Sequence, residues 1–254
     1  MTDVVVVGAG PSGLAAAVAL AGRGVGVEVV ERRTEGWTTS RAAVVHAGTL
    51  RVLDALGAGA PLVRCGLRVP RFAVRDRGRD DPLLAVDFGD LGGAHPYALL
   101  VPQWRTEEVL RARARDLGVP VRGGETVLDV RPDGDGAVLT TDRGLRRCRL
   151  VVGADGTGST VRERAGIAHR RRRLAESFAL ADVRLHHDDR QPCVALHLSG
   201  AGALVEAPLP DGVVRFVAPV AAAPAEPGAA FVQDLLDTRG PRAAPRVAEV
   251  VWSS

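Results

Sequence analysis

The sequence predicts an α/β fold, with a parallel sheet flanked by helices and a region of short strands inserted between its segments. Two runs, residues 4–7 and 150–152, are short, continuously apolar and rich in Val, which is typical of strands buried on both faces of a parallel sheet. Each run leads into a glycine-containing turn. Between and after them, short strand-like runs separated by turn residues indicate a mixed or antiparallel sheet.

The first 31 residues predict a βαβ unit. After the first strand, residues 11–23 carry apolar side chains at helical spacing, and Gly24 supplies a C-terminal cap. Residues 25–30 are again apolar and β-branched and predict the second strand.

The rest of the chain alternates between helical and strand patterns. Residues 49–56, 106–117 and 229–238 have helical spacing, with Thr106 as a candidate N-cap of the second helix. Strand-like runs fill much of 67–101, 119–152 and 178–220, and 247–252 begins another strand. The run Asp133-Gly134-Asp135-Gly136 predicts a hairpin turn.

Composition excludes several classes of protein. The 254 residues are 46% apolar and 25% charged, ordinary values for a globular protein, and a net charge of +3 is too small to indicate a nucleic-acid partner. No apolar run is long enough for a membrane span, and a strand begins almost at once, which leaves no room for a signal peptide. The three scattered cysteines form no CxxC pair, so neither a metal site nor a disulfide framework is expected. A reducing, cytoplasmic location is the expectation.

The first chemical motif is Gly8-Ala9-Gly10-Pro11-Ser12-Gly13. A GxGxxG alone is weak, but this one lies between a buried strand and a helix, and Glu31 ends the next strand, which is the context of a dinucleotide-binding fingerprint. Gly8 allows the tight turn, Gly10 lets the backbone approach a pyrophosphate, and Gly13 lets the helix pack closely. The Glu31 carboxylate can accept hydrogen bonds from an adenosine ribose and would repel a 2′-phosphate. FAD or NAD therefore fits better than NADP.

The second motif is Gly153-Ala154-Asp155-Gly156, at the end of the strand over residues 150–152. Open α/β sheets bind ligands at the carboxyl ends of their strands, where Asp155 would lie. A tight Asp-Gly turn with no ligand is the plainer interpretation of this motif taken alone. The first fingerprint favours the ligand-binding interpretation.

Taken together, these motifs resemble the para-hydroxybenzoate hydroxylase-like, single-component (group A) flavoprotein monooxygenases, in particular those that hydroxylate aromatic polyketides. The resemblance runs over nearly the whole chain. It is carried by the GxGxxG with Glu31-Arg32, Ser40-Arg41-Ala42, Val101-Pro102-Gln103 before Thr106-Glu107, Gly153–Gly156 with Ser159 and Val161-Arg162, and Leu180-Ala181-Asp182-Val183.

The resemblance implies a role for particular residues. Ser12 would contact the pyrophosphate of FAD, Glu31 the adenosine ribose, and Arg41 the phosphates or the ribityl chain. Gln103 would contact the ribityl region, and Asp155 would belong to the turn used for FAD and for incoming NADPH. The implied cofactor-binding residues are Gly8, Gly10, Pro11, Ser12, Gly13, Glu31, Arg32, Arg41, Gln103, Asp155 and Gly156; no catalytic residue and no metal ligand is implied.

The resemblance also implies an FAD-binding Rossmann-like (GR2-type) fold with an inserted substrate region. Residues 1–66 and 103–176 would form the FAD-binding part, residues 67–102 and 177–220 the sheet-rich substrate region, and residues 221–254 the return toward the FAD-binding part. NADPH and O2 would then hydroxylate a small aromatic substrate through a flavin C4a-hydroperoxide. The cofactor carries the chemistry, which explains why the sequence shows no triad or paired carboxylates.

One family motif has no counterpart here: a strand ending in Gly-Asp, followed by a loop and a helix facing the flavin. Gly89-Asp90 and Gly134-Asp135 are interpreted as loop and turn. The fold is therefore expected to be incomplete at the C-terminus, with an unfilled position in the parallel sheet. Three alternatives stay open: an inactive fragment, one half of a split flavoprotein completed by a C-terminal polypeptide, or a flavin-dependent reductase of the geranylgeranyl-reductase type.

Overall fold

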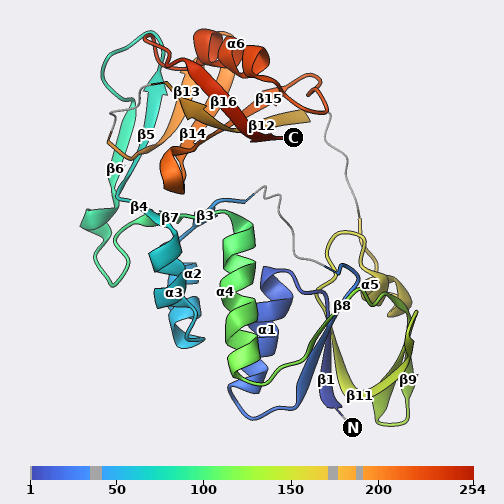
Figure 1. Ribbon diagram of the computed structural model, residues 1–254. Coiled ribbons are helices and arrows are strands. Elements are labelled where there is room, and N and C mark those ends of the chain that lie inside the picture. Colours follow the sequence, from blue (N-terminus) through green and yellow to red (C-terminus); the bar gives the residue numbers. More distant parts are fainter. Residues whose placement is uncertain (1, 35–41, 171–176, 187–190) are drawn as a thin grey trace. The chain divides into compact units, whose positions relative to one another are not determined.

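The computed structural model describes residues 2–34, 42–170, 177–186 and 191–254. The chain divides into two compact units (Figure 1). The first comprises Met1–Ser40, Val52–Leu62 and Gln103–Arg171, and the second Arg41–Arg51, Val63–Pro102 and Arg172–Ser254. The first unit contains one sheet and the second contains two, and each unit is described by itself.

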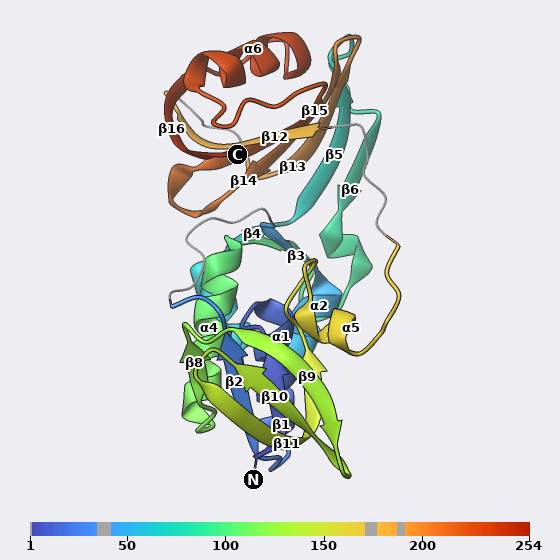
Figure 2. The ribbon, with the colours of Figure 1, turned by 90° about the vertical axis from the view of Figure 1, so that its right-hand side faces the viewer.

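The first unit is built on a six-stranded sheet of order β8-β2-β1-β11-β10-β9 (Figure 2). The strands β8, β2, β1 and β11 are parallel, and β9, β10 and β11 form an antiparallel meander. Their bounds are β1 Thr2–Val7, β2 Val27–Glu31, β8 Val121–Gly123, β9 Val127–Asp133, β10 Gly136–Thr141 and β11 Gly144–Gly153.

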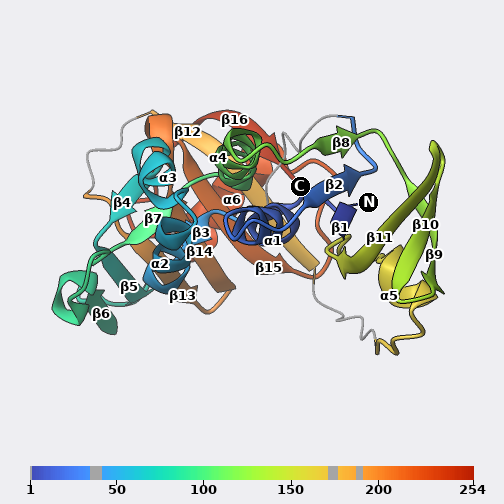
Figure 3. The same cartoon turned by 90° about the horizontal axis from the view of Figure 1, so that it is seen from below.

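Helix α1 (Pro11–Ala21) packs beside α4 (Gln103–Asp116), and the short helix α5 (Thr160–Arg164) lies against β9 (Figure 3). Strand β1 lies in the middle of the core, because Val4 to Val7 are all buried, as its continuous apolar run predicts. On the meander side, Val5 and Val7 pack with Leu139 and Cys148. The apolar run of β1 therefore anchors both faces of the sheet.

The elements expected in this unit are present, with shifted ends. The second strand begins at Val27, because the residues before it form the turn after α1. Helix α4 begins at Gln103, three residues before the expected cap. The hairpin between β9 and β10 turns where the Asp-Gly repeat predicts, with Asp133 paired to Gly136.

Strand β11 has two partners along its length. Its residues 144–148 pair with β10 and its residues 148–153 pair with β1. Among the strands that the structure describes, none pairs with the other edge of residues 149–153, and the Leu150 side chain is 66% exposed. The parallel sheet thus ends in an open edge at β11.

The second unit contains a seven-stranded sheet of order β16-β12-β15-β14-β13-β5-β6 and a three-stranded sheet of order β3-β7-β4. Among the described strands of the larger sheet, only β5 and β13 are parallel neighbours. The bounds are β5 Arg71–Asp76, β6 Leu84–Asp87, β12 Ser177–Leu185, β13 Val194–Ser199, β14 Gly202–Pro208, β15 Val214–Val220 and β16 Val247–Ser253, with β3 Val44–Val45, β4 Leu67–Val69 and β7 Ala98–Leu100.

One face of the larger sheet is covered by a helix. Helix α6 (Ala229–Arg239) buries Val232 and Leu236 against Phe216 on this face.

The remaining elements of the chain are the helices α2 (Ala47–Ala55) and α3 (Gly59–Cys65) and the 3-10 turns η1 (Phe88–Leu91) and η2 (Pro210–Gly212). Sequence reasoning missed α3, a seven-residue helix with too few turns to show a period. No helix in the described parts of the chain has the length and apolar character that a membrane span requires.

The placement of residues 221–254 differs from the expectation of a return toward the FAD-binding part. Helix α6 and strand β16 belong to the second unit, and β16 pairs with β12 in an antiparallel ladder. The physical reason is apolar burial, since Val247 and Val250 of β16 pack against the core that α6 forms with the sheet.

Candidate cofactor-binding site

Three parallel strands of the first unit end at one edge of its sheet. Strand β1 leads into Gly8, β2 ends at Glu31, and β11 leads into Ala154. The Gly8 N–H donates to the Val30 carbonyl at 2.8 Å, and the Ala154 N–H donates to the Val7 carbonyl at 2.8 Å. These bonds hold the three turns together at the carboxyl ends of the strands, the place where open α/β sheets bind ligands.

The glycines of the first turn have distinct structural roles. Gly8 has a φ of +104°, which an L side chain rarely adopts, and a Cβ there would clash with the Ala154 carbonyl. A Cβ at Gly13 would clash with the Gly8 carbonyl, so α1 can approach the turn only with glycine at this position. Two of the three glycines are therefore required by packing within the protein.

Gly10 differs, because a Cβ at this position would meet nothing within 4 Å. It is the N-cap of α1, with φ −71° and ψ 176°, a conformation open to any residue, and no side chain caps the helix. The N–H groups of Ser12 and Gly13 in the first turn have no acceptor inside the helix. They face the space beside Gly10 with the positive end of the helix dipole, which suits an anion such as a pyrophosphate.

The Glu31 carboxylate is held in place by two backbone N–H groups. Oε2 accepts from the Ala9 N–H at 2.7 Å, and Oε1 accepts from the Arg33 N–H at 3.1 Å. A carboxylate has about four acceptor positions, so further donors such as ribose hydroxyls can still bind. The same bonds join the end of β2 to the glycine-rich turn.

These turns enclose a pocket of about 270 Å³. That is just below the range of ~300–1,000 Å³ typical of ligand sites, so the pocket suits part of a dinucleotide. Its lining consists of Val7, Gly8, Gly10, Val30, Glu31, Arg32, Arg33, Glu125, Thr126, Val127, Ala154, Asp155, Gly156, Thr157, Gly158 and Thr160. The open space at Gly10 and the free N-terminus of α1 fit the pyrophosphate of FAD, and the Glu31 carboxylate fits its adenosine ribose.

The Asp155 side chain organises its own turn. Its Oδ1 accepts from the Ser159 hydroxyl at 2.5 Å, and its Oδ2 accepts from the Val161 N–H at 3.2 Å. Ser159 in turn caps α5 through the Arg162 N–H at 3.0 Å. The carboxylate thus shapes the loop, and residues of that loop line the pocket.

The residues that the sequence analysis proposed for cofactor binding are distributed around this pocket. Six of them line it: Gly8, Gly10, Glu31, Arg32, Asp155 and Gly156. Pro11, Ser12 and Gly13 form the first turn of α1. Gln103 is not among the lining residues; it begins α4 and its amide donates to Glu107 at 2.9 Å. Arg41 lies outside the described residues.

Sequence reasoning missed the wall formed by residues 125–127. The Gly124 N–H donates to the Arg33 carbonyl at 2.8 Å, and the Glu125 N–H donates to the Glu31 carbonyl at 2.9 Å. This wall follows β8, a fourth parallel strand that ends at this edge of the sheet. The Gly123-Gly124 pair at the end of that strand was the available signal.

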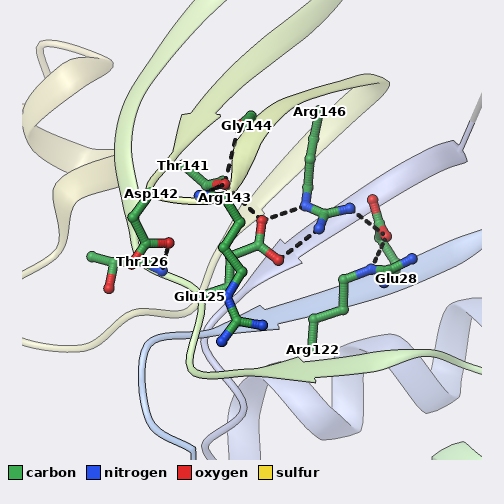
Figure 4. Close-up of polar contacts among 9 residues, drawn as sticks. All are labelled: Glu28, Arg122, Glu125, Thr126, Thr141, Asp142, Arg143, Gly144 and Arg146. Carbon is green, nitrogen blue, oxygen red and sulfur yellow. Dashed lines mark hydrogen bonds and ion pairs between the residues drawn. The ribbon is translucent and has the colours of Figure 1, made fainter.

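A network of charged side chains fixes the position of Glu125 in this wall (Figure 4). The Glu125 carboxylate, 1% exposed, accepts from the Arg146 guanidinium at 2.6 Å on each of its oxygens and from the Thr141 hydroxyl at 2.7 Å. Glu28 accepts from Arg122 at 2.9 Å and from Arg146 at 3.3 Å. The hydrogen bonds from Arg146 lower the pKa of Glu125 despite its burial. Glu125 is therefore an ionised group inside the unit.

Comparison with known proteins identifies a family for this chain. A family model described as "FAD binding domain" matches residues 1–230. The 6-methylpretetramide 4-monooxygenase of Streptomyces rimosus is 38% identical over 217 residues, which cover 82% of this chain and 38% of that relative. The anhydrotetracycline monooxygenase of the same organism is 39% identical over 175 residues, covering 65% of this chain and 33% of that relative.

Solved structures agree on the fold. The OxyS anhydrotetracycline hydroxylase from Streptomyces rimosus matches with a TM-score of 0.72 at 32% identity, covering 99% of this chain and 51% of that one. The flavin-dependent monooxygenase PieE, solved in complex with FAD and substrate, matches with a TM-score of 0.83 at 20% identity, covering 100% of this chain and 49% of that one. The second similarity concerns the fold alone.

Proposed function

The chain belongs to the FAD binding domain family, and from that membership we propose that it is the FAD-binding part of a monooxygenase that hydroxylates an aromatic substrate. The observation that carries the proposal is the pocket at the carboxyl ends of β1, β2 and β11, where the free N-terminus of α1 and the Glu31 carboxylate line one space. The printed names of the relatives, monooxygenases of 6-methylpretetramide and anhydrotetracycline, support the reaction class.

In this proposal the chain's own residues bind and orient the cofactor. The N–H groups at the start of α1 hold the pyrophosphate, and the open space at Gly10 lets it approach the backbone. Glu31 accepts from the adenosine ribose while Ala9 and Arg33 keep its carboxylate in place. The turn at Asp155-Gly156 lies across the pocket, and Arg41 and Gln103 are proposed to contact the phosphates and the ribityl chain.

When bound, FAD would supply the redox chemistry: two electrons from NADPH reduce O2, one oxygen atom enters an aromatic C–H bond as hydroxyl, and the other leaves as water. NADPH is proposed as a transient co-substrate, because the Glu31 carboxylate would repel its 2′-phosphate if NADPH occupied the pocket permanently. The partners are a small aromatic substrate and O2, and the proposed location is the cytoplasm.

The chain spans 38% and 33% of the length of the two relatives compared above, so the complete reaction is proposed for a protein of that kind. The edge of β11 beside Leu150 has no partner among the described strands, so a further strand could pair there. Unpaired backbone groups and apolar side chains at a sheet edge favour pairing with a further strand. We propose that a C-terminal polypeptide segment completes the sheet at this edge.

FAD binding by this chain tests the proposal directly. The chain is mixed with FAD, passed through a gel-filtration column, and its bound flavin is measured by visible absorbance. The informative variant is Gly10→Ala, whose Cβ meets no protein atom within 4 Å and would meet only the ligand. The matched control is Gly228→Ala, because Gly228 is also the N-cap of an 11-residue helix, with φ −82°, ψ 174° and open space around it.

We expect the unmodified chain to retain FAD and Gly10→Ala to bind it at least about tenfold more weakly, which corresponds to ~1.4 kcal/mol. Gly228→Ala should bind FAD normally, since both variants share the same small capping cost. Equal affinity in both variants would refute the assigned pyrophosphate position, and colourless unmodified protein would refute FAD binding by this chain alone. NADPH oxidation with and without O2 then separates a monooxygenase from a reductase, because only the monooxygenase requires O2.

A further inference from the structure

A second hollow lies in the second unit, on the face of the seven-stranded sheet that carries α6. One cross-strand row there contains small side chains: Ala85, Ala73 and Ala195 are directly opposite one another on β6, β5 and β13, and Glu206 follows on β14. The row continues to Phe216, which packs against α6. Because alanine reaches so little above a sheet, the row leaves a cavity of about 510 Å³, the alanine hollow.

Larger polar side chains stand on both sides of this row. Side chains two positions apart on a strand share a face, so Arg71 and Arg75 flank Ala73. Cys193 lies on the Arg71 side, and His197, directly opposite Arg75, lies on the other. All four residues line the cavity. The alanine hollow therefore has an apolar floor and two polar walls.

One rim of the alanine hollow is fixed by the end of α6. The Arg77 guanidinium donates to the Gly240 carbonyl at 2.6 Å and to the Pro241 carbonyl at 3.0 Å. Pro241 lines the cavity, and Pro82 lines it from the turn before β6. The two prolines add apolar surface above the alanine floor. Such a site accommodates an apolar body as well as a charged group.

Among the described residues that line the alanine hollow, Arg71, Arg75 and Glu206 carry charge. Glu206 is buried, and its Oε2 is hydrogen-bonded to Nε2 of His197 at 2.9 Å. Its carboxylate therefore already has a partner within the protein. Arg71 and Arg75 are exposed, and neither forms a hydrogen bond or an ion pair with any residue in the described parts of the chain. Their Cα atoms are about 13 Å apart along β5, so both guanidinium groups can reach an anion over the floor.

We propose that the alanine hollow binds a small organic carboxylate, with its apolar body on Ala73, Ala85 and Ala195 and its carboxylate between Arg71 and Arg75. Guanidinium groups bind carboxylates with two parallel N–H···O bonds, so the pair supplies both affinity and orientation. A volume of about 510 Å³ lies within the range of ligand sites, ~300–1,000 Å³. The site is built entirely within the second unit and does not depend on FAD.

Cys193 provides a local reporter for occupancy of the alanine hollow. Its thiol lines the cavity, and burial raises its pKa, so alkylation by iodoacetamide is measured at alkaline pH and located by peptide mass spectrometry. Cys65 is exposed and serves as an internal reference in the same molecule. The probe is benzoate, and its neutral analogue benzamide and inorganic phosphate are the controls.

We expect saturating benzoate to slow alkylation of Cys193 at least about fivefold, because well above Kd most molecules have the site occupied. The alkylation rate of Cys65 should not change. Benzamide and inorganic phosphate should have little effect, because one lacks the charge and the other the apolar body. The double variant Arg71→Gln/Arg75→Gln should lose the protection. The control Arg51→Gln/Arg79→Gln, which removes the same charge from two other exposed positions, should retain it.

Three outcomes would each overturn the proposal. Unchanged alkylation of Cys193 at all benzoate concentrations would show that the alanine hollow does not bind this class of ligand. Equal protection by inorganic phosphate, or full protection in the Arg71→Gln/Arg75→Gln variant, would show that the apolar floor or the arginine pair has no part in binding. Circular dichroism of each variant confirms that the comparison is made between folded proteins.

Discussion

The ion pair between Glu125 and Arg146 gives the sharpest test of how the pocket wall is held. Replacing Arg146 by Met removes two hydrogen bonds of 2.6 Å to Glu125, whose side chain is 1% exposed, and leaves that carboxylate with the Thr141 hydroxyl. Glu28 keeps Arg122 at 2.9 Å, so one buried charge rather than two loses its cation. Removing one partner of a buried ion pair typically costs about 3–5 kcal/mol. We expect about 3 kcal/mol, because Arg146 is itself 20% exposed.

Urea unfolding followed by far-ultraviolet circular dichroism measures this free energy, with the double variant Glu125→Met/Arg146→Met as the control. If the loss comes from the stranded charge, the double variant should be more stable than Arg146→Met alone. A loss below about 1 kcal/mol for Arg146→Met, or strictly additive losses in the double variant, would refute this account of the network.

Three further predictions follow from single contacts. Because Arg146 lowers the folded-state pKa of Glu125, this carboxylate stabilises the fold fully above the ordinary carboxyl pKa of about 4.3, and the stabilisation is lost as the pH falls through the lower folded-state value. Urea titrations below pH ~4.3 should therefore show that the free energy of unfolding falls less steeply with pH in Glu125→Gln than in the unmodified protein. Gly13→Ala should destabilise the first unit by about 1–3 kcal/mol in thermal unfolding, since its Cβ clashes with a backbone oxygen, and an unchanged melting temperature would contradict the packing described. Arg215→Met strands Asp182, now held by bonds of 2.6 and 2.8 Å, and should cost about 3–5 kcal/mol in urea unfolding, whereas a neutral effect would mean that the carboxylate finds water.

Local patterns along the chain were enough to predict the parallel core and the glycine-rich turn at the carboxyl end of its first strand. The run of buried valines in β1, the glycine-rich turn and Glu31 lie within 31 residues of one another. Their arrangement follows from short-range geometry, because a strand, a tight turn and a helix place the first-turn N–H groups beside the end of the next strand. The hairpin at Asp133–Gly136 was predictable for the same reason.

Contacts between distant segments were decided only in the tertiary structure. Glu125 and Arg146 are 21 residues apart, and nothing in either local sequence indicates that they meet behind the pocket. Strand β16 joins β12 across more than 60 residues because apolar burial against α6 outweighs any local preference for where a strand should pair. The alanine hollow likewise exists only when β6, β5 and β13 align three small side chains in one row. Sequence by itself determined most of the elements and the conformation of the glycine-rich turn. Register, burial and long-range pairing depend on the folded chain, because they arise from side chains that only folding brings together.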